Sequence, residues 1–106
     1  MSGRIVGEVL NHAPADLTPA ELLVMIALGE DARERDRLAL RSDLESLVRK
    51  TRLKPGTIRN ALSELKARGL IVPQRKTTYR GGFGHQDYYI GRLHDGHRDA
   101  TTRWPR

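Results

Sequence analysis

LRSDLESLVRKTRLKPGTIRNALSELKARGLIV, residues 40–72, predicts two short helices joined by a tight connection. We expect the first helix over 43–50 and the second over 55–68, because apolar residues recur three and four positions apart in both. Pro55 suits the first position of a helix, and Gly69 suits the position just after one. These signals place the two helices next to each other in the fold.

Two further stretches carry helix-start signals, in which Ser or Thr is followed three residues later by Glu. TPAE at 18–21 predicts a helix over 19–28 that is apolar almost all round and therefore buried on more than one side, either as a central core helix or as half of a dimer interface. SDLE at 42–45 predicts that Ser42 caps the 43–50 helix. Between these helices, the residues at 38–40 favour one short strand.

Downstream of the second short helix, the pattern changes to that of a β-hairpin. A strand is expected over 70–72, at a sheet edge because Pro73 cannot donate a backbone hydrogen bond. A glycine-rich turn at 81–84 leads to a returning strand over 88–90. By alternation along that strand, Tyr89 is expected to face inward.

The two ends of the chain are expected to lie outside the central domain, residues 18–93. Residues 1–17 form an arm or short helix whose Ile5/Val6/Val9/Leu10 stripe is either a dimer contact or part of the monomer core. Residues 94–106 are polar and without periodicity, which is typical of a disordered tail.

The positive charge is concentrated in one part of the sequence. The net charge is +6, yet residues 1–48 carry five basic and nine acidic side chains, whereas residues 49–80 carry ten basic side chains and one acid, Glu64. Such a concentration indicates a polyanionic partner, because each phosphate that is neutralised releases counterions. The alternative is a solvated basic surface without a partner.

Several function classes are disfavoured. Without cysteine, there is no disulfide framework, thiolate zinc site or cysteine nucleophile. The longest apolar stretch, residues 22–28, is too short to span a bilayer, and no signal peptide is visible, so we expect a cytoplasmic, nucleoid-associated protein. The four histidines are scattered, and no catalytic pair stands out. We therefore expect no enzyme activity, no cofactor, no metal site and no small-molecule ligand.

The order of helix, short strand, helix, tight turn, helix and hairpin resembles the winged helix-turn-helix family of bacterial regulators and plasmid or phage replication initiators. TIRNALSELKARGLI (57–71) and TYRGGFGHQDYYI (78–90) carry the resemblance, which covers residues 38–90. Ser46 occupies a position where the family often has Ala. The resemblance implies an α+β, mostly helical fold with a three-helix core and a β-hairpin wing.

This resemblance also implies that helix 55–68 enters the major groove of double-stranded DNA, with hairpin 70–92 as the wing. Arg59 and Asn60 would read bases, while other cations and hydroxyl groups would contact phosphates. The full set of candidate DNA-binding residues is Ser42, Arg49, Arg52, Lys54, Thr57, Arg59, Asn60, Ser63, Lys66, Arg75, Lys76 and Arg80.

The leading hypothesis is a sequence-specific transcriptional regulator that acts as a homodimer on two half-sites. A DNA-binding module for plasmid or phage replication or segregation is the second hypothesis, since it would use the same surface. The third is a winged-helix module that binds a protein or RNA.

Overall fold

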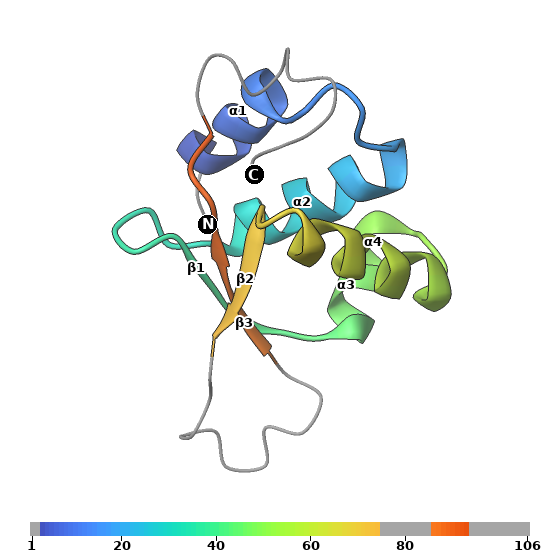
Figure 1. Ribbon diagram of the computed structural model, residues 1–106. Coiled ribbons are helices and arrows are strands. Elements are labelled where there is room, and N and C mark those ends of the chain that lie inside the picture. The colour runs from blue at the N-terminus through green and yellow to red at the C-terminus, as the bar shows by residue number, and fades with distance from the viewer. Residues whose placement is uncertain (1–2, 75–85, 94–106) are drawn as a thin grey trace.

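The computed structural model describes residues 3–74 and 86–93, and the side chain of Arg41 is outside this description (Figure 1). Its helices and strands are α1 (Gly3–His12), α2 (Pro19–Asp31), β1 (Leu38–Ser42), α3 (Leu44–Thr51), α4 (Pro55–Ala67), β2 (Ile71–Gln74) and β3 (Gln86–Ile90). The described residues thus form four helices and a three-stranded antiparallel sheet. This mixed, mainly helical arrangement is compatible with a winged helix.

Helix α2 is the centre of the core, which is the first of the two roles predicted for it, and its buried residues belong to the core of the same chain. It contacts α1, α3, α4, β1 and β3, with α1 on one side and α3 and α4 on the other (Figure 1). Its start is also as predicted. The Glu21 amide donates to Thr18 Oγ1 at 3.1 Å, the Thr18 amide donates to Glu21 Oε1 at 3.0 Å, and Pro19 is the first helical residue.

The end of α2 lies further along the chain than expected, at Asp31 instead of near Leu28. Gly29 continues the helix and is buried against α1. A Cβ atom at this position would lie 3.2 Å from Ile5 Cγ2, which is tighter than an ordinary contact. The glycine therefore allows two helices to pack closely and does not mark a helix end.

Helix α3 is capped by Asp43, so the prediction that Ser42 caps it is wrong. The Ser46 amide donates to Asp43 Oδ1 at 2.8 Å. Ser42 is still in β1, where it pairs with Gln86, and its hydroxyl is buried without a hydrogen-bond partner among the described residues. Because the strand extends through Ser42, the helix begins one residue later than its Ser-x-x-Glu pattern indicates.

Helix α4 follows the prediction closely. Pro55 is its first residue, and it ends in a Schellman motif around Gly69, which has φ of +77°. The Leu70 amide donates to Leu65 O, and the Gly69 amide donates to Lys66 O, both at 3.0 Å. Leu65 and Leu70 are both buried, which anchors the end of the helix to the core.

The sheet has the strand order β1-β3-β2, so the returning strand of the hairpin is central. Strand β2 lies at an edge, as Pro73 predicts. The pairing of β1 with β3 was not predicted. It joins Leu38 to Tyr89 and Ala39 to Tyr88, and the register shifts between Ala39 and Ser42.

The inward residue of β3 is Tyr88, so the prediction for Tyr89 is wrong. Tyr88 and Ile90 are buried two positions apart, whereas Tyr89 is half-buried. Side chains alternate between the two faces of a strand, and fully buried Ile90 fixes which set faces the core.

Helix α1 contributes Ile5 and Val9 to the core of the same chain, where both are fully buried. These two residues therefore belong to the monomer core and not to a dimer contact. Leu10, from the same predicted stripe, is 52% exposed. The predicted tail, residues 94–106, lies outside the described residues.

Arg37 connects the start of β1 to α1 and to the end of β3 through hydrogen bonds. Its backbone is left-handed, with φ of 59°, and its side chain is buried. Nε donates to Ile90 O at 2.8 Å and Nη2 donates to Gly91 O at 3.0 Å, while both terminal nitrogens donate to the Glu8 carboxylate. This residue thus joins three segments that are distant in sequence.

Within the described parts of the chain, no helix has both the length and the apolar character that crossing a bilayer requires.

Candidate nucleic-acid interface

The outward face of α4 carries Arg59 and Asn60, the two predicted base-contacting residues, together with further DNA-binding candidates. Arg59, Asn60, Ser63 and Lys66 are exposed and recur three and four positions apart, which places them on one face. The opposite face carries buried Ile58, Ala61 and Leu65. The hydrophobic anchoring of α4 therefore orients its polar residues toward solvent.

Three further candidates lie where α3 connects to α4. Arg49, Arg52 and Lys54 are all exposed. Arg52 is the C-cap of α3 in the left-handed conformation, with φ of 64°, and its amide donates to Val48 O at 2.8 Å. A left-handed backbone is unfavourable for a residue with a Cβ atom. This turn therefore places an arginine where a glycine would be less strained.

The cations on this surface have no acidic partners among residues 3–74 and 86–93. In that part of the chain, Arg49, Arg52 and Arg59 form no ion pair, and the same holds for Lys54 and Lys66. Their positive charge is therefore available to an external anion.

Lys50, by contrast, is held by acids at the end of α2. Its Nζ donates to Glu30 Oε1 at 2.8 Å and to Asp31 Oδ1 at 2.6 Å. Burial would lower the pKa of Lys50, but the hydrogen bonds and charges of Asp31 and Glu30 outweigh burial and raise the pKa. Lys50 therefore serves to connect α3 to α2.

Arg68 is held in the same way. It donates to Asp16 through Nη1 at 2.9 Å and to Glu64 through Nε at 2.8 Å. These hydrogen bonds raise the pKa of Arg68 and lower that of Asp16. The basic segment predicted from the sequence thus contains two cations that serve internal contacts.

Thr57 lies at the edge of the α4 face, in the first turn of the helix, and is exposed. Together with Asn60 it lines a hollow of about 160 Å³ against the first turn of α2, where Thr18 and Glu21 also contribute. Glu21 therefore lies close to Asn60, a predicted base-contacting residue. The sequence did not indicate this proximity.

Among the remaining candidates, Ser42 is not displayed on this surface. Ser42 is buried in β1, so its hydroxyl does not face an external phosphate. Arg75, Lys76 and Arg80, the predicted wing contacts, lie outside the described residues. Residues 3–74 and 86–93 contain no group of three or more His, Asp or Glu side chains that could hold a metal ion.

No protein-family model matches the sequence, and no curated protein matches it. A solved structure of BpsR from Bordetella bronchiseptica, which concerns the regulation of its DNA binding by 6-hydroxynicotinic acid, is similar to this chain with a TM-score of 0.49 and 22% sequence identity. The similarity covers 83% of this chain and spans 59% of the BpsR chain. A likeness this distant does not establish a shared fold or function.

Proposed function

We propose that this chain is a winged helix-turn-helix protein that binds double-stranded DNA sequence-specifically as a small transcriptional regulator. The observation that carries the proposal is the set of exposed cations on α3, its turn and α4 that lack acidic partners among the described residues. Double-stranded DNA supplies the dense negative charge that such a surface complements.

In this proposal, α4 occupies the major groove. A helix of 13 residues is about 20 Å long, and a helix with its side chains fits the groove width of about 12 Å. Arg59 would donate two hydrogen bonds to guanine and Asn60 would form two with adenine, each giving about 1–3 kcal/mol of discrimination. Ser63, between them on the same face, is positioned for a further base contact.

Residues around α4 would contact the DNA backbone. Arg49, Arg52, Lys54 and Lys66 surround the reading face and are suited to phosphates on either side of the groove. The Thr57 hydroxyl, in the first turn of α4, would donate to a phosphate beside the backbone amides. The hairpin that joins β2 to β3 would form the wing, with Arg75, Lys76 and Arg80 as its phosphate or minor-groove contacts.

We also propose that the protein acts as a homodimer on two half-sites. Since Ile5 and Val9 are used internally, the contact is reassigned to exposed Leu10 and to the apolar hollow of about 210 Å³ beside it. Leu10, Leu17 and Leu22 line this hollow. Sedimentation of the wild-type chain and of Leu10→Glu tests this: a monomer at every concentration would exclude the dimer.

The experiment that tests DNA binding is selection from a genomic fragment pool followed by sequencing, with the wild type, Arg59→Ala and Asn60→Ala. Arg35→Ala is the matched control, because Arg35 is an exposed arginine that lies outside α3 and α4. We expect the wild type to enrich a short sequence motif. Both α4 variants should enrich it with lower base specificity, and the control should enrich it as the wild type does.

The other outcomes decide between the alternatives. Iterated sites near a replication origin would favour a role in replication or segregation over a promoter regulator. Equal affinity for duplex DNA and A-form RNA would favour an RNA-binding module. The absence of binding to any fragment at low salt would overturn the proposal.

A further inference from the structure

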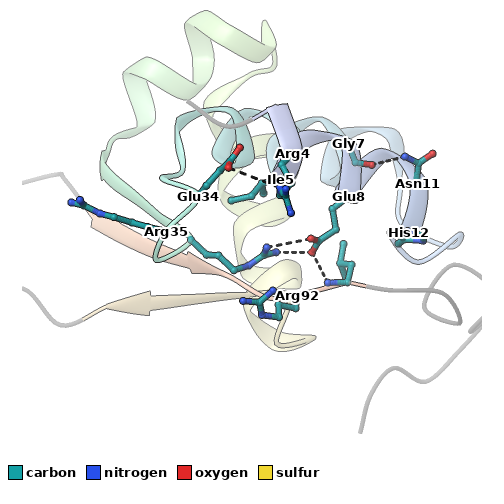
Figure 2. A pocket seen from close by; sticks show the side chains of 11 residues that line it. Arg4, Ile5, Gly7, Glu8, Asn11, His12, Glu34, Arg35 and Arg92 are labelled. Carbon is teal, nitrogen blue, oxygen red and sulfur yellow. Dashed lines mark hydrogen bonds and ion pairs between the residues drawn. The ribbon is translucent and has the colours of Figure 1, made fainter.

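A second polar surface lies away from α3 and α4. It is a hollow of about 870 Å³ lined by α1, by the loop between α2 and β1, and by the residues that follow β3 (Figure 2). Its charged lining residues are Arg4, Glu8, Glu34, Arg35, Arg37 and Arg92. The volume is in the range of small-molecule sites, and the lining is mainly polar.

The negative charge of Glu8 is already used within the chain. Glu8 Oε1 accepts from Arg37 Nη1 at 3.2 Å, and Oε2 accepts from Arg37 Nη2 at 2.6 Å and from the Leu93 amide at 2.6 Å, as the dashed lines in Figure 2 show. The side chains of Arg37 and Glu8 are 6% and 17% exposed. This pair forms a fixed, internally neutral part of the lining.

The other arginines of the lining are not neutralised by strong ion pairs with described residues. Arg4 lies 3.9 Å from Glu34, at the outer limit of an ion pair, and both side chains are well exposed, so the pairing is weak. Arg92 and Arg35 have no ion pair with any described residue. With four arginines against two glutamates, the charged lining has an excess of two positive charges.

The hollow is separate from the proposed DNA surface. No residue of α3 or α4 lines it. Strand β3 ends at Ile90, and the hollow is lined by Arg92 and Leu93, which follow that end. The site therefore lies between α1, the loop before β1 and the residues that follow β3.

We propose that this hollow binds a small organic dianion, either a dicarboxylate or a phosphate monoester, through the guanidinium groups of Arg92 and Arg4. A ligand with two negative charges matches the positive excess of the lining, and arginine recognises carboxylate and phosphate oxygens through paired hydrogen bonds. Arg37 stays with Glu8, so the ligand does not disrupt the core. This site does not depend on the DNA-binding proposal.

Calorimetric titration of the full chain tests the site with three probes: glutarate, phenyl phosphate and neutral glutaramide. We expect one or both dianions to bind and glutaramide not to bind. The variant Arg4→Gln/Arg92→Gln should lose about tenfold or more in affinity, the loss expected when a charge-assisted hydrogen bond is removed. A preference for one dianion identifies which oxygen group the ligand carries.

Arg49→Gln is the matched control, because Arg49 is exposed on α3 and does not line the hollow. It should keep the dianion affinity of the wild type. Equal dianion affinity in the wild type and the double variant, or no binding at about 10 mM probe, would overturn the proposal.

Duplex DNA binding, measured on the same variants, separates the two proposals. If the wild type binds no dianion and the double variant loses DNA affinity, the hollow belongs to the DNA contact and the dianion site is wrong. If the dianions bind as expected while no variant binds DNA, only the proposed function fails. Both arginines are exposed, so thermal unfolding is expected to show a folded double variant.

Discussion

Two arginines among residues 3–74 and 86–93 have left-handed backbones, and their surroundings differ. Arg37 is buried and its side chain donates to two carbonyls and a carboxylate, which compensates for the backbone strain. Arg52 is exposed and makes no side-chain ion pair within the described residues. Unfavourable backbone conformations without local compensation are found at functional positions. Arg52 is therefore a residue at which stability and DNA binding are expected to diverge.

Arg52→Gly should separate these two properties. Glycine removes a left-handed cost of about 1–2 kcal/mol, partly offset by about 0.5–1 kcal/mol of extra freedom in the unfolded chain. We expect denaturant unfolding to show equal or higher stability. DNA affinity should fall roughly five- to tenfold near 0.1 M salt through the loss of one phosphate contact.

Arg52→Ala is the comparison for that experiment, because alanine removes the charge and keeps the strain. It should lose the same DNA affinity and be less stable than the glycine variant. A glycine variant that binds DNA as well as the wild type would remove Arg52 from the interface.

Glu8 gives the stability of the fold a specific dependence on pH. Burial would raise the pKa of its carboxyl, but hydrogen bonds from Arg37 and from the Leu93 amide outweigh burial and hold the pKa below its usual 4.5. The contribution of Glu8 is therefore present above about pH 4.5 and is lost as pH falls through the lower folded-state value.

Glu8→Gln should accordingly destabilise the protein by about 2 kcal/mol at neutral pH, because a buried charge-assisted network is broken. The difference from the wild type should shrink in acid, where Glu8 itself becomes protonated. Denaturant unfolding between about pH 3 and pH 7 measures this. Glu45→Gln, at an exposed position of α3, is the control and should remain close to the wild type throughout.

Among the elements, α4 has the clearest sequence-determined boundaries. Gly69 takes φ of +77°, and a Cβ atom there would meet nothing within 4 Å. Gly69→Ala should therefore lower the free energy of unfolding by about 1–2 kcal/mol through backbone strain alone.

The matched control is Gly56→Ala, at the other end of α4, where a Cβ atom also has open space and φ is not positive. It should be neutral or stabilising by up to about 1 kcal/mol.

We expect Gly69→Ala to lower the melting temperature and Gly56→Ala to leave it unchanged or raise it. The two variants should therefore differ in unfolding free energy by at least the backbone cost at Gly69. If both lower the stability equally, the loss comes from reduced solvation or packing, and the Schellman assignment would not account for the choice of glycine.

The helices could be predicted because their signals are local. The start of α2 depends on Thr18, Pro19 and Glu21, and the end of α4 depends on Gly69 and the two buried leucines around it. Each of these contacts lies within six residues, so the sequence order contains the information directly. The outward face of α4 follows from the same periodicity.

Contacts between distant segments were not predictable in this way. The pairing of β1 with β3 determines that Ser42 belongs to a strand, and no neighbouring residue indicates this. The partners of Lys50 lie about 20 residues away in sequence, and Asp16, one of the two partners of Arg68, lies about 50 residues away, so charge counting treats both cations as free. The hollow beside α1 also depends on tertiary packing, and the sequence predicted no small-molecule ligand.

For the whole molecule, the distribution of free and paired cations predicts how salt affects DNA binding. The logarithm of the binding constant should fall linearly with the logarithm of salt concentration, by about 0.9 for each phosphate neutralised. Arg49→Gln should reduce that slope by about 1. Lys50→Gln should leave it unchanged, because Lys50 is bound to Glu30 and Asp31.

These two variants alter neighbouring residues of one helix and remove the same charge, so they form a matched pair. Fluorescence anisotropy across a range of salt concentrations gives both slopes. Equal slopes for the two variants would mean that total charge, and not its placement on α3 and α4, governs association.

The strand order β1-β3-β2 also has a consequence for how the chain is made. On the ribosome, β1 emerges well before β3, its partner in the sheet, and synthesis proceeds at about 5–20 residues per second. For a period on the order of seconds, the helices around α2 can assemble while β1 has an open edge. Strand β3 then pairs with β1 on one side and with β2 on the other. Of the described strands, the last to be made is thus the central one, which completes this sheet.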